Sequence, residues 1–186
     1  MIDLFLPFLL YSFLGFLLEL LHARVHGSRG HGRKCLLFLP LCPVYGFGTL
    51  AILHMPAPLL NNPLTVFLAG GLLATLVEYG VALFYQVGAG VKFWDYSQQP
   101  GNLGGKICPL YTLFWSLLSL PLVYVFHPFL RRLLDLAAGL PAWLLQLLFL
   151  FFAADSLVSL WLLHRTGSTD CLMWYCPPLQ PRRQAQ

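Results

Sequence analysis

The chain has 186 residues, of which 58% are hydrophobic and only 10% are charged, and its net charge is +4. A soluble domain carries about 25% charged residues, so a water-soluble protein of this length could not cover its surface. The composition excludes a soluble globular domain and predicts an all-α, polytopic integral membrane protein. We attribute the uneven basic charge to membrane topology and expect no nucleic-acid partner.

Residues 4–22 form the first predicted span. No basic residue precedes it and no small-residue cleavage site follows, so we expect a retained helix and not a signal peptide. A membrane helix needs about 20 apolar residues. Four further segments meet this condition, giving about five spans in a single transmembrane domain over 1–186: 36–55, 64–89, 107–127 and 140–163. The stretch between the last two is expected to lie at the membrane interface.

Lys and Arg residues predict the orientation, because they concentrate in cytoplasmic loops. With the N-terminus outside, only Arg131 and Arg132 fall outside the cytoplasm. The other nine of the eleven are Arg24, Arg29, Arg33, Lys34, Lys92, Lys106, Arg165, Arg182 and Arg183. We therefore expect an outside N-terminus and a polar cytoplasmic tail over 165–186.

Three acids, Glu19, Glu78 and Asp155, fall within predicted spans. An ionisable group there costs at least a few kcal/mol, so it normally faces protein or water. Glu78 shares a helix face with small residues, which predicts a helix–helix contact or a cavity. Glu19 is alternatively an interfacial anchor. Asp155, one turn from Ser159, is alternatively a neutral helix-packing residue.

A Cys-Pro pair follows each acid-bearing helix: Cys42-Pro43, Cys108-Pro109 and Cys176-Pro177. The first two read Cys-Pro-x-Tyr and predict a two-helix repeat about an axis along the membrane normal. The third has no return helix after it.

Proline is harmless in the first turn of a helix, so Cys42 and Cys108 are expected at helix N-termini, where a thiolate is favoured. Both cysteines are candidate nucleophiles, and the alternative is that they are small buried residues. The cysteine spacing fits no zinc site, and we expect no metal and no cofactor.

The loop after the third predicted span carries aromatic residues, Asp95 and Asn102 among glycines. It is either an interfacial segment with a turn or a loop that lines the cytoplasmic mouth of a cavity. In the N-out orientation, several polar candidates point to the cytoplasmic side. They predict one inward-facing polar pocket with Lys34, Lys92 and Lys106 at its rim. The candidate substrate-binding residues are Glu19, Tyr45, Glu78, Asp95 and Asn102.

Five motifs occur in order: "YSFLGFLLE", "PLCPVYGFG", "EYG", "WDYS" and "NLGGKIC". Over about residues 8–128 the chain resembles the ABC-transporter type IV (CmpB-like) family of bacterial membrane proteins. The family tends to carry Trp where Phe16 stands, an acid where Gln86 stands, and "RGFL" in place of residues 34–37. Pro109 is not typical of the family, which weakens the repeat as a family feature.

The resemblance implies a permease-like transport component of the bacterial inner membrane. The expected inward-facing polar pocket, with basic residues at its rim, suits a small amphipathic or anionic molecule. The chain has no Walker A sequence, so any ATPase would be a separate subunit. Five helices are few for a transporter, so we expect a homo-oligomer among membrane lipids. Two alternatives to this non-enzymatic function are a lipid-modifying enzyme with Cys42 or Cys108 as nucleophile, and a non-catalytic assembly factor.

Overall fold

The computed structural model describes residues 2–25 and 35–172, and their regular structure is helical. The helices, in chain order, are α1 (Ile2–Val25), α2 (Pro43–Leu53), α3 (Ala57–Leu60), α4 (Pro63–Thr65), the π-helix η1 (Val66–Gly70), α5 (Gly71–Ala89), α6 (Pro109–Pro121), the π-helix η2 (Leu122–Phe126), α7 (His127–Ala138), α8 (Ala142–Thr166) and the 3-10 helix η3 (Thr169–Leu172). The all-α prediction is confirmed. Cys176, the basic residues 29–34 and most of the predicted tail lie outside the described residues.

Four helical stretches are long and apolar enough to cross a membrane: Leu4–Val25, Pro63–Ala89, Pro109–Ala137 and Ala142–Thr166. The expected second span, 36–55, differs. It is helical only over Pro43–Leu53, a length of about 16 Å. Residues 35–42 form a non-helical loop instead, because part of their backbone is hydrogen-bonded to α8.

The expected interfacial stretch after residue 127 forms α7, which continues from α6 through η2. Its exposed face carries Phe129, Leu133 and Leu136, with Arg131 and Arg132 also exposed. A helix that exposes both apolar and charged side chains suits the boundary between acyl chains and headgroups. The predicted break is therefore a bend in one long helical stretch.

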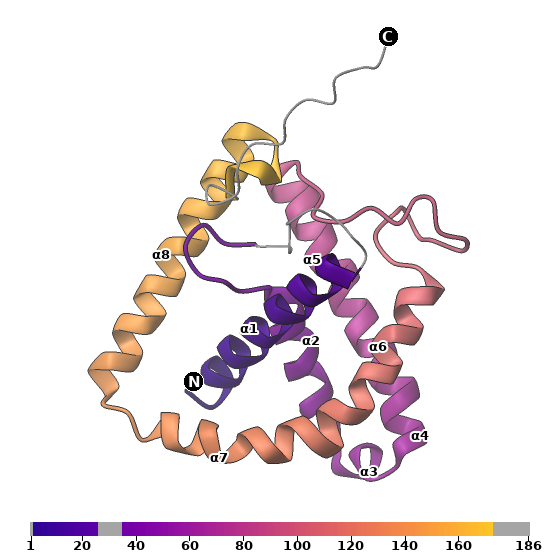
Figure 1. Cartoon of the computed structure of the whole chain (residues 1–186), viewed down its shortest axis with the longest axis vertical. Coiled ribbons are helices and arrows are strands. Elements are labelled where there is room, and N and C mark those ends of the chain that lie inside the picture. Colours follow the sequence, from indigo (N-terminus) through magenta and orange to yellow (C-terminus); the bar gives the residue numbers. More distant parts are fainter. Residues whose placement is uncertain (1, 26–34, 173–186) are drawn as a thin grey trace.

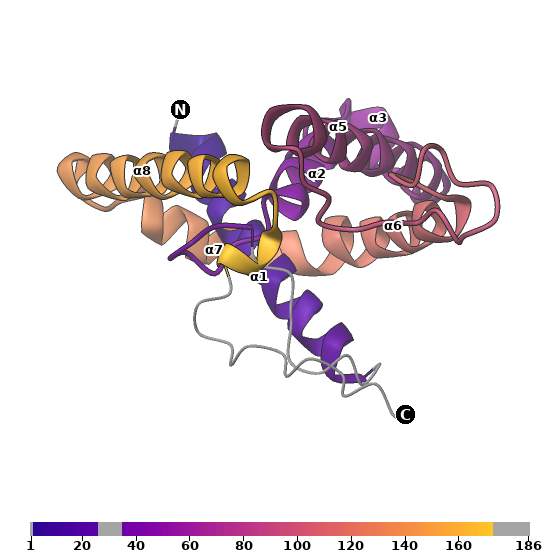
Figure 2. The ribbon, with the colours of Figure 1, turned by 90° about the horizontal axis from the view of Figure 1, so that it is seen from above.

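In Figure 1, α1 and α2 lie at the centre of the view, with the other long helices around the edge. In that view α8 lies on one side, α5 and α6 on the other, and α7 crosses between them at the bottom. The Phe5 ring of α1 lies 5.3 Å from Phe149 and 5.8 Å from Phe152 of α8. Seen from above, the C-terminal half of α1 projects beyond the other helices (Figure 2).

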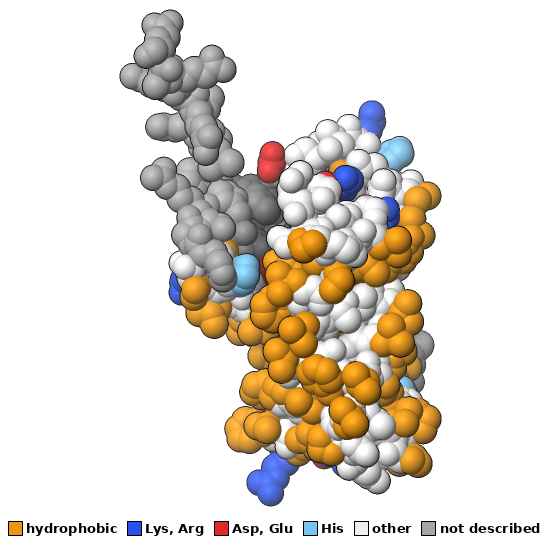
Figure 3. Space-filling model, turned by 90° about the vertical axis from the view of Figure 1, so that its right-hand side faces the viewer, with side chains coloured by type: hydrophobic (Ala, Val, Ile, Leu, Met, Phe, Trp, Pro, Cys, Tyr) orange, Lys and Arg blue, Asp and Glu red, His pale blue; other side chains and the backbone are white. Residues whose placement is uncertain are grey.

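Charge and hydrophobicity separate along the molecule. Apolar side chains cover the middle of the face shown in Figure 3, and most Lys and Arg side chains on that face lie toward its two ends. The loop after α5 lies at the end of the molecule opposite α7 (Figure 1). An apolar band between charged ends is what a bilayer requires, so the chain is an integral membrane protein.

Candidate functional site

Glu78 lies in the middle of α5, and only 4% of its surface is exposed. Its Oε1 accepts a hydrogen bond from the Tyr96 hydroxyl at 2.9 Å. Its Oε2 accepts one from the Trp115 indole Nε1 at 2.9 Å. Tyr96 comes from the loop after α5 and Trp115 from α6, so each carboxyl oxygen has a donor from a different segment.

Small residues position this carboxyl. Ala74 and Thr75 are buried on the same face of α5, and the Thr75 hydroxyl donates to the Thr112 hydroxyl of α6 at 3.1 Å. A side chain added at Gly71 would collide with Ser116. The small-residue face of α5 thus packs closely on α6, as the sequence predicted, and directs Glu78 into protein and away from lipid.

Tyr45 connects the second glutamate, Glu19, to the side chains around Glu78. Its hydroxyl donates to Glu19 Oε1 at 2.9 Å, and its ring centroid lies 5.0 Å from that of Trp115. We call Glu19, Tyr45, Glu78, Tyr96 and Trp115 the two-glutamate cluster. Side chains from α1, α2, α5, α6 and the loop after α5 meet in it.

Gly15 of α1 makes room for Tyr45, because a Cβ at this position would collide with the Tyr45 ring. We expect Gly15→Ala to displace the ring from Glu19 and to cost about 1–3 kcal/mol by overpacking. Gly80→Ala on α5 is the matched control, because nothing lies within 4 Å of its added Cβ. Thermal unfolding in detergent measures both; equal unfolding temperatures would contradict the close contact.

Cys42 and Cys108 are the N-caps of α2 and α6, with Pro43 and Pro109 beginning the helices, as predicted. The thiol-bearing residues are 1% and 3% exposed, and both pack in the cluster of buried residues that contains Trp94 and Tyr96. They therefore lie near the two-glutamate cluster but inside the protein.

The two Cys-Pro-x-Tyr units differ beyond the helix start. Tyr45 donates directly to Glu19, whereas the ring of Tyr111 stacks on Tyr96 at 4.3 Å, and Tyr96 donates to Glu78. Each unit thus supports its glutamate with tyrosine, the second one through an intermediate ring.

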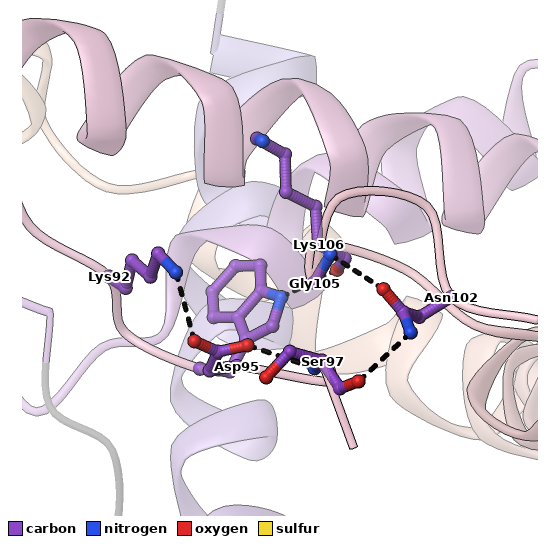
Figure 4. Close-up of polar contacts among 7 residues, drawn as sticks. Lys92, Asp95, Ser97, Asn102, Gly105 and Lys106 are labelled. Carbon is purple, nitrogen blue, oxygen red and sulfur yellow. Dashed lines mark hydrogen bonds and ion pairs between the residues drawn. The ribbon is translucent and has the colours of Figure 1, made fainter. Parts of the chain in front are cut away.

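Asp95 and Asn102 lie apart from this cluster, and both bond within their own loop (Figure 4). Trp94 and Tyr96 are buried, so Asp95 between them points outward to the Lys92 ammonium at 2.9 Å and accepts from the Ser97 amide. Asn102 donates to the Ser97 and Gln99 carbonyls and accepts from the Gly105 amide.

Of the five predicted substrate-binding residues, Glu19, Tyr45 and Glu78 meet in the two-glutamate cluster. Asp95 and Asn102 instead shape the loop after α5. Gly105 has φ of +70°, and an added Cβ there would meet Asp95 Oδ1 at 2.6 Å, so the loop requires glycine. The Trp94 indole completes the loop by donating to the Lys106 carbonyl at 2.8 Å.

Hydrogen bonds from Lys92 and Ser97 hold the pKa of Asp95 at about 2. An Asp carboxyl in an unfolded chain has a pKa of about 3.9. The stability that the ionised Asp95 carboxylate adds to the folded protein is therefore complete above that pH and is lost as the pH falls toward 2. We therefore expect Asp95 to stay charged at every pH near neutrality. The normalised pH profile of ligand binding should be the same for Asp95→Asn and wild type between about pH 5 and 8; a displaced midpoint would contradict this.

A groove of about 430 Å³ runs along the start of α6. Cys108, Thr112 and Ser116 line it together with Gly101, Leu103 and Ile107 of the loop. The five residues of the two-glutamate cluster do not line this groove. Among the described residues, the polar side chains of the two-glutamate cluster bond to one another.

Asp155 of α8 is 2% exposed and holds the loop before α2. Its carboxyl oxygens accept from the amides of Leu37, Phe38 and Leu39, the shortest bond being 2.7 Å, from Leu39. Ser159 accepts a further bond from the Leu37 amide at 2.8 Å. Asp155 thus binds backbone, a role that differs from the helix packing considered above.

Sequence reasoning missed Trp115 and Tyr96 as the donors to Glu78. The available signal was chemical: a carboxyl buried in a membrane protein needs N–H or O–H donors, and Trp115 lies in the neighbouring span.

Comparison with known protein families shows what the chain is similar to. The family model described as "Putative ABC-transporter type IV" matches residues 6–160. No curated protein and no solved structure matches the chain.

Proposed function

The chain belongs to the ABC-transporter type IV family, a transport-related class of membrane protein, and on that premise we propose that it is a permease-like component that binds a small amphipathic or anionic molecule beside Glu78. The proposal includes an outside N-terminus, a bacterial inner-membrane location, a separate ATPase subunit and assembly into a homo-oligomer.

The hydrogen bonding of Glu78 is the observation that carries this proposal. Trp115 can only donate, so it fixes Oε2 as an acceptor. Tyr96 can donate or accept, so Oε1 can gain a proton and donate it to the Tyr96 oxygen. Glu78 can therefore change its protonation state while its bonds to Tyr96 and Trp115 are kept, a property suited to a transport site in a membrane.

The surroundings support an anionic or amphipathic ligand. The groove beside the cluster has hydroxyls along α6 and apolar side chains from the loop. Lys106 is half-buried and its ammonium lies 5.9 Å from the centre of the Tyr79 ring. Lys106 lines a smaller hollow together with Lys92 and Trp94, and not the groove itself. The loop supplies a cation and the groove supplies apolar side chains, and these are the two kinds of group that suit an amphipathic anion.

The burial of Cys42 favours transport over an enzyme that uses this thiol. A nucleophilic cysteine must reach its substrate, whereas Cys42 is 1% exposed and does not line the groove.

A thermal-shift screen tests the proposal. The purified full chain would be heated in detergent with a panel of carboxyfluorescein, medium-chain fatty acids and lysophospholipids. A ligand at 100 times its Kd adds about 2.7 kcal/mol to stability, so a specific ligand raises the unfolding temperature of wild type. A panel without such a ligand, or one that stabilises Glu78→Gln equally, would contradict the proposal.

A further inference from the structure

Cys35 and Cys42 bring two thiols together at the ends of the loop before α2. Their sulfur atoms lie 3.8 Å apart, and the residues are 3% and 1% exposed. The Cys35 amide donates to the Leu41 carbonyl at 3.4 Å, so the backbone of the two ends is also close. A disulfide needs Cα atoms within about 4.4–6.8 Å and can form where such a loop already closes on itself.

We propose that Cys35 and Cys42 form a thiol–disulfide redox site that exchanges with low-molecular-weight disulfides such as oxidised glutathione. One cysteine thiolate attacks a sulfur of the external disulfide and releases one thiol. The second cysteine then attacks the mixed disulfide and releases the other. Two S–H bonds are lost and one S–S bond forms in the protein, while the external disulfide is reduced to two thiols.

The loop between the cysteines controls access to this site. Leu37, Phe38 and Leu39 lie between them in sequence, and their amides are held by Asp155 of α8. Figure 1 shows the loop reaching from α2 toward α8. Because both thiols are buried, exchange requires local opening of the loop, and the bonds to Asp155 oppose that opening.

The site also connects to the two-glutamate cluster. Cys42 caps α2, its amide donates to the Ser12 carbonyl of α1, and Tyr45 follows three residues later. A disulfide would fix the loop at the start of α2 and so restrict the helix that carries Tyr45. The proposal does not depend on the transported ligand.

The test uses the full chain in membrane vesicles, incubated with oxidised glutathione and then alkylated. Peptide mapping of wild type should show Cys35 joined to Cys42, and dithiothreitol should reverse the bond. Cys108→Ser and Cys171→Ser should retain it, while Cys35→Ser and Cys42→Ser should lose it.

Asp155→Asn removes one carboxylate acceptor and should raise the alkylation rate of reduced Cys35 and Cys42 about tenfold, because the loop opens more often. Ser156→Ala, a change at the half-buried neighbouring position, should leave that rate unchanged. A stable mixed disulfide with glutathione, a bond from Cys35 to another cysteine, or no bond even in Asp155→Asn would overturn the proposal.

Discussion

Replacing Glu78 with leucine is expected to lower the free energy of unfolding by about 2–6 kcal/mol, since two buried donors lose their acceptor at about 1–3 kcal/mol each. The substitution leaves the Tyr96 hydroxyl and the Trp115 indole N–H without their acceptors. Unfolding in SDS or by heat in detergent measures the loss. A hydrogen bond between helices of a membrane protein contributes about 0.6 kcal/mol to stability on average. The expected loss of stability therefore comes mainly from the two buried donors that lose Glu78 as their acceptor.

Glu78→Gln separates structure from function at the same position. The glutamine carbonyl can accept from Trp115, and its amide can donate to the Tyr96 oxygen. We therefore expect its stability to stay within about 1 kcal/mol of wild type. If leucine were tolerated as well as glutamine, the hydrogen bonds to Glu78 would not hold the helices together.

Replacing Asp155 with leucine is expected to have a similarly large effect, about 2–6 kcal/mol, because the Phe38 and Leu39 amides lose their acceptor at about 1–3 kcal/mol each, while the Leu37 amide keeps its bond to Ser159. Water that enters the opened loop will reduce this cost. The same unfolding measurements apply, and faster hydrogen exchange at Leu37, Phe38 and Leu39 should accompany the loss.

Ser156→Ala is the control for this change. The neighbouring Ser156 hydroxyl bonds only to the Phe152 carbonyl of its own helix among the contacts described, at 2.7 Å. Its replacement should cost less than about 0.5 kcal/mol. Equal destabilisation by Asp155→Leu and Ser156→Ala would show that the bonds to the loop contribute nothing.

The sequence predicted the features that depend on local chemistry. Composition fixed the membrane class, and the Cys-Pro pairs marked the first turns of α2 and α6. The small-residue face of α5 predicted that Glu78 would face another helix, because only small side chains permit close backbone approach.

Features that depend on distant partners could not be predicted. The 36–55 segment is apolar enough for a span, yet residues 35–42 are non-helical because their amides bond to Asp155, 118 residues away from Leu37. Asp95 was predicted to bind substrate because it is a polar residue in a loop rich in aromatic residues and glycines. Burial of its neighbours Trp94 and Tyr96 instead turns its side chain outward to Lys92.

The most direct test of Glu78 as the ligand-binding group is the Kd of the best stabilising compound from the thermal-shift screen. It would be measured in nanodiscs for wild type and for Glu78→Gln. We expect binding to Glu78→Gln to be at least tenfold weaker, a loss of about 1.4 kcal/mol, with an unchanged unfolding temperature in the absence of ligand. The same Kd for both proteins would contradict a role for the Glu78 carboxyl in binding.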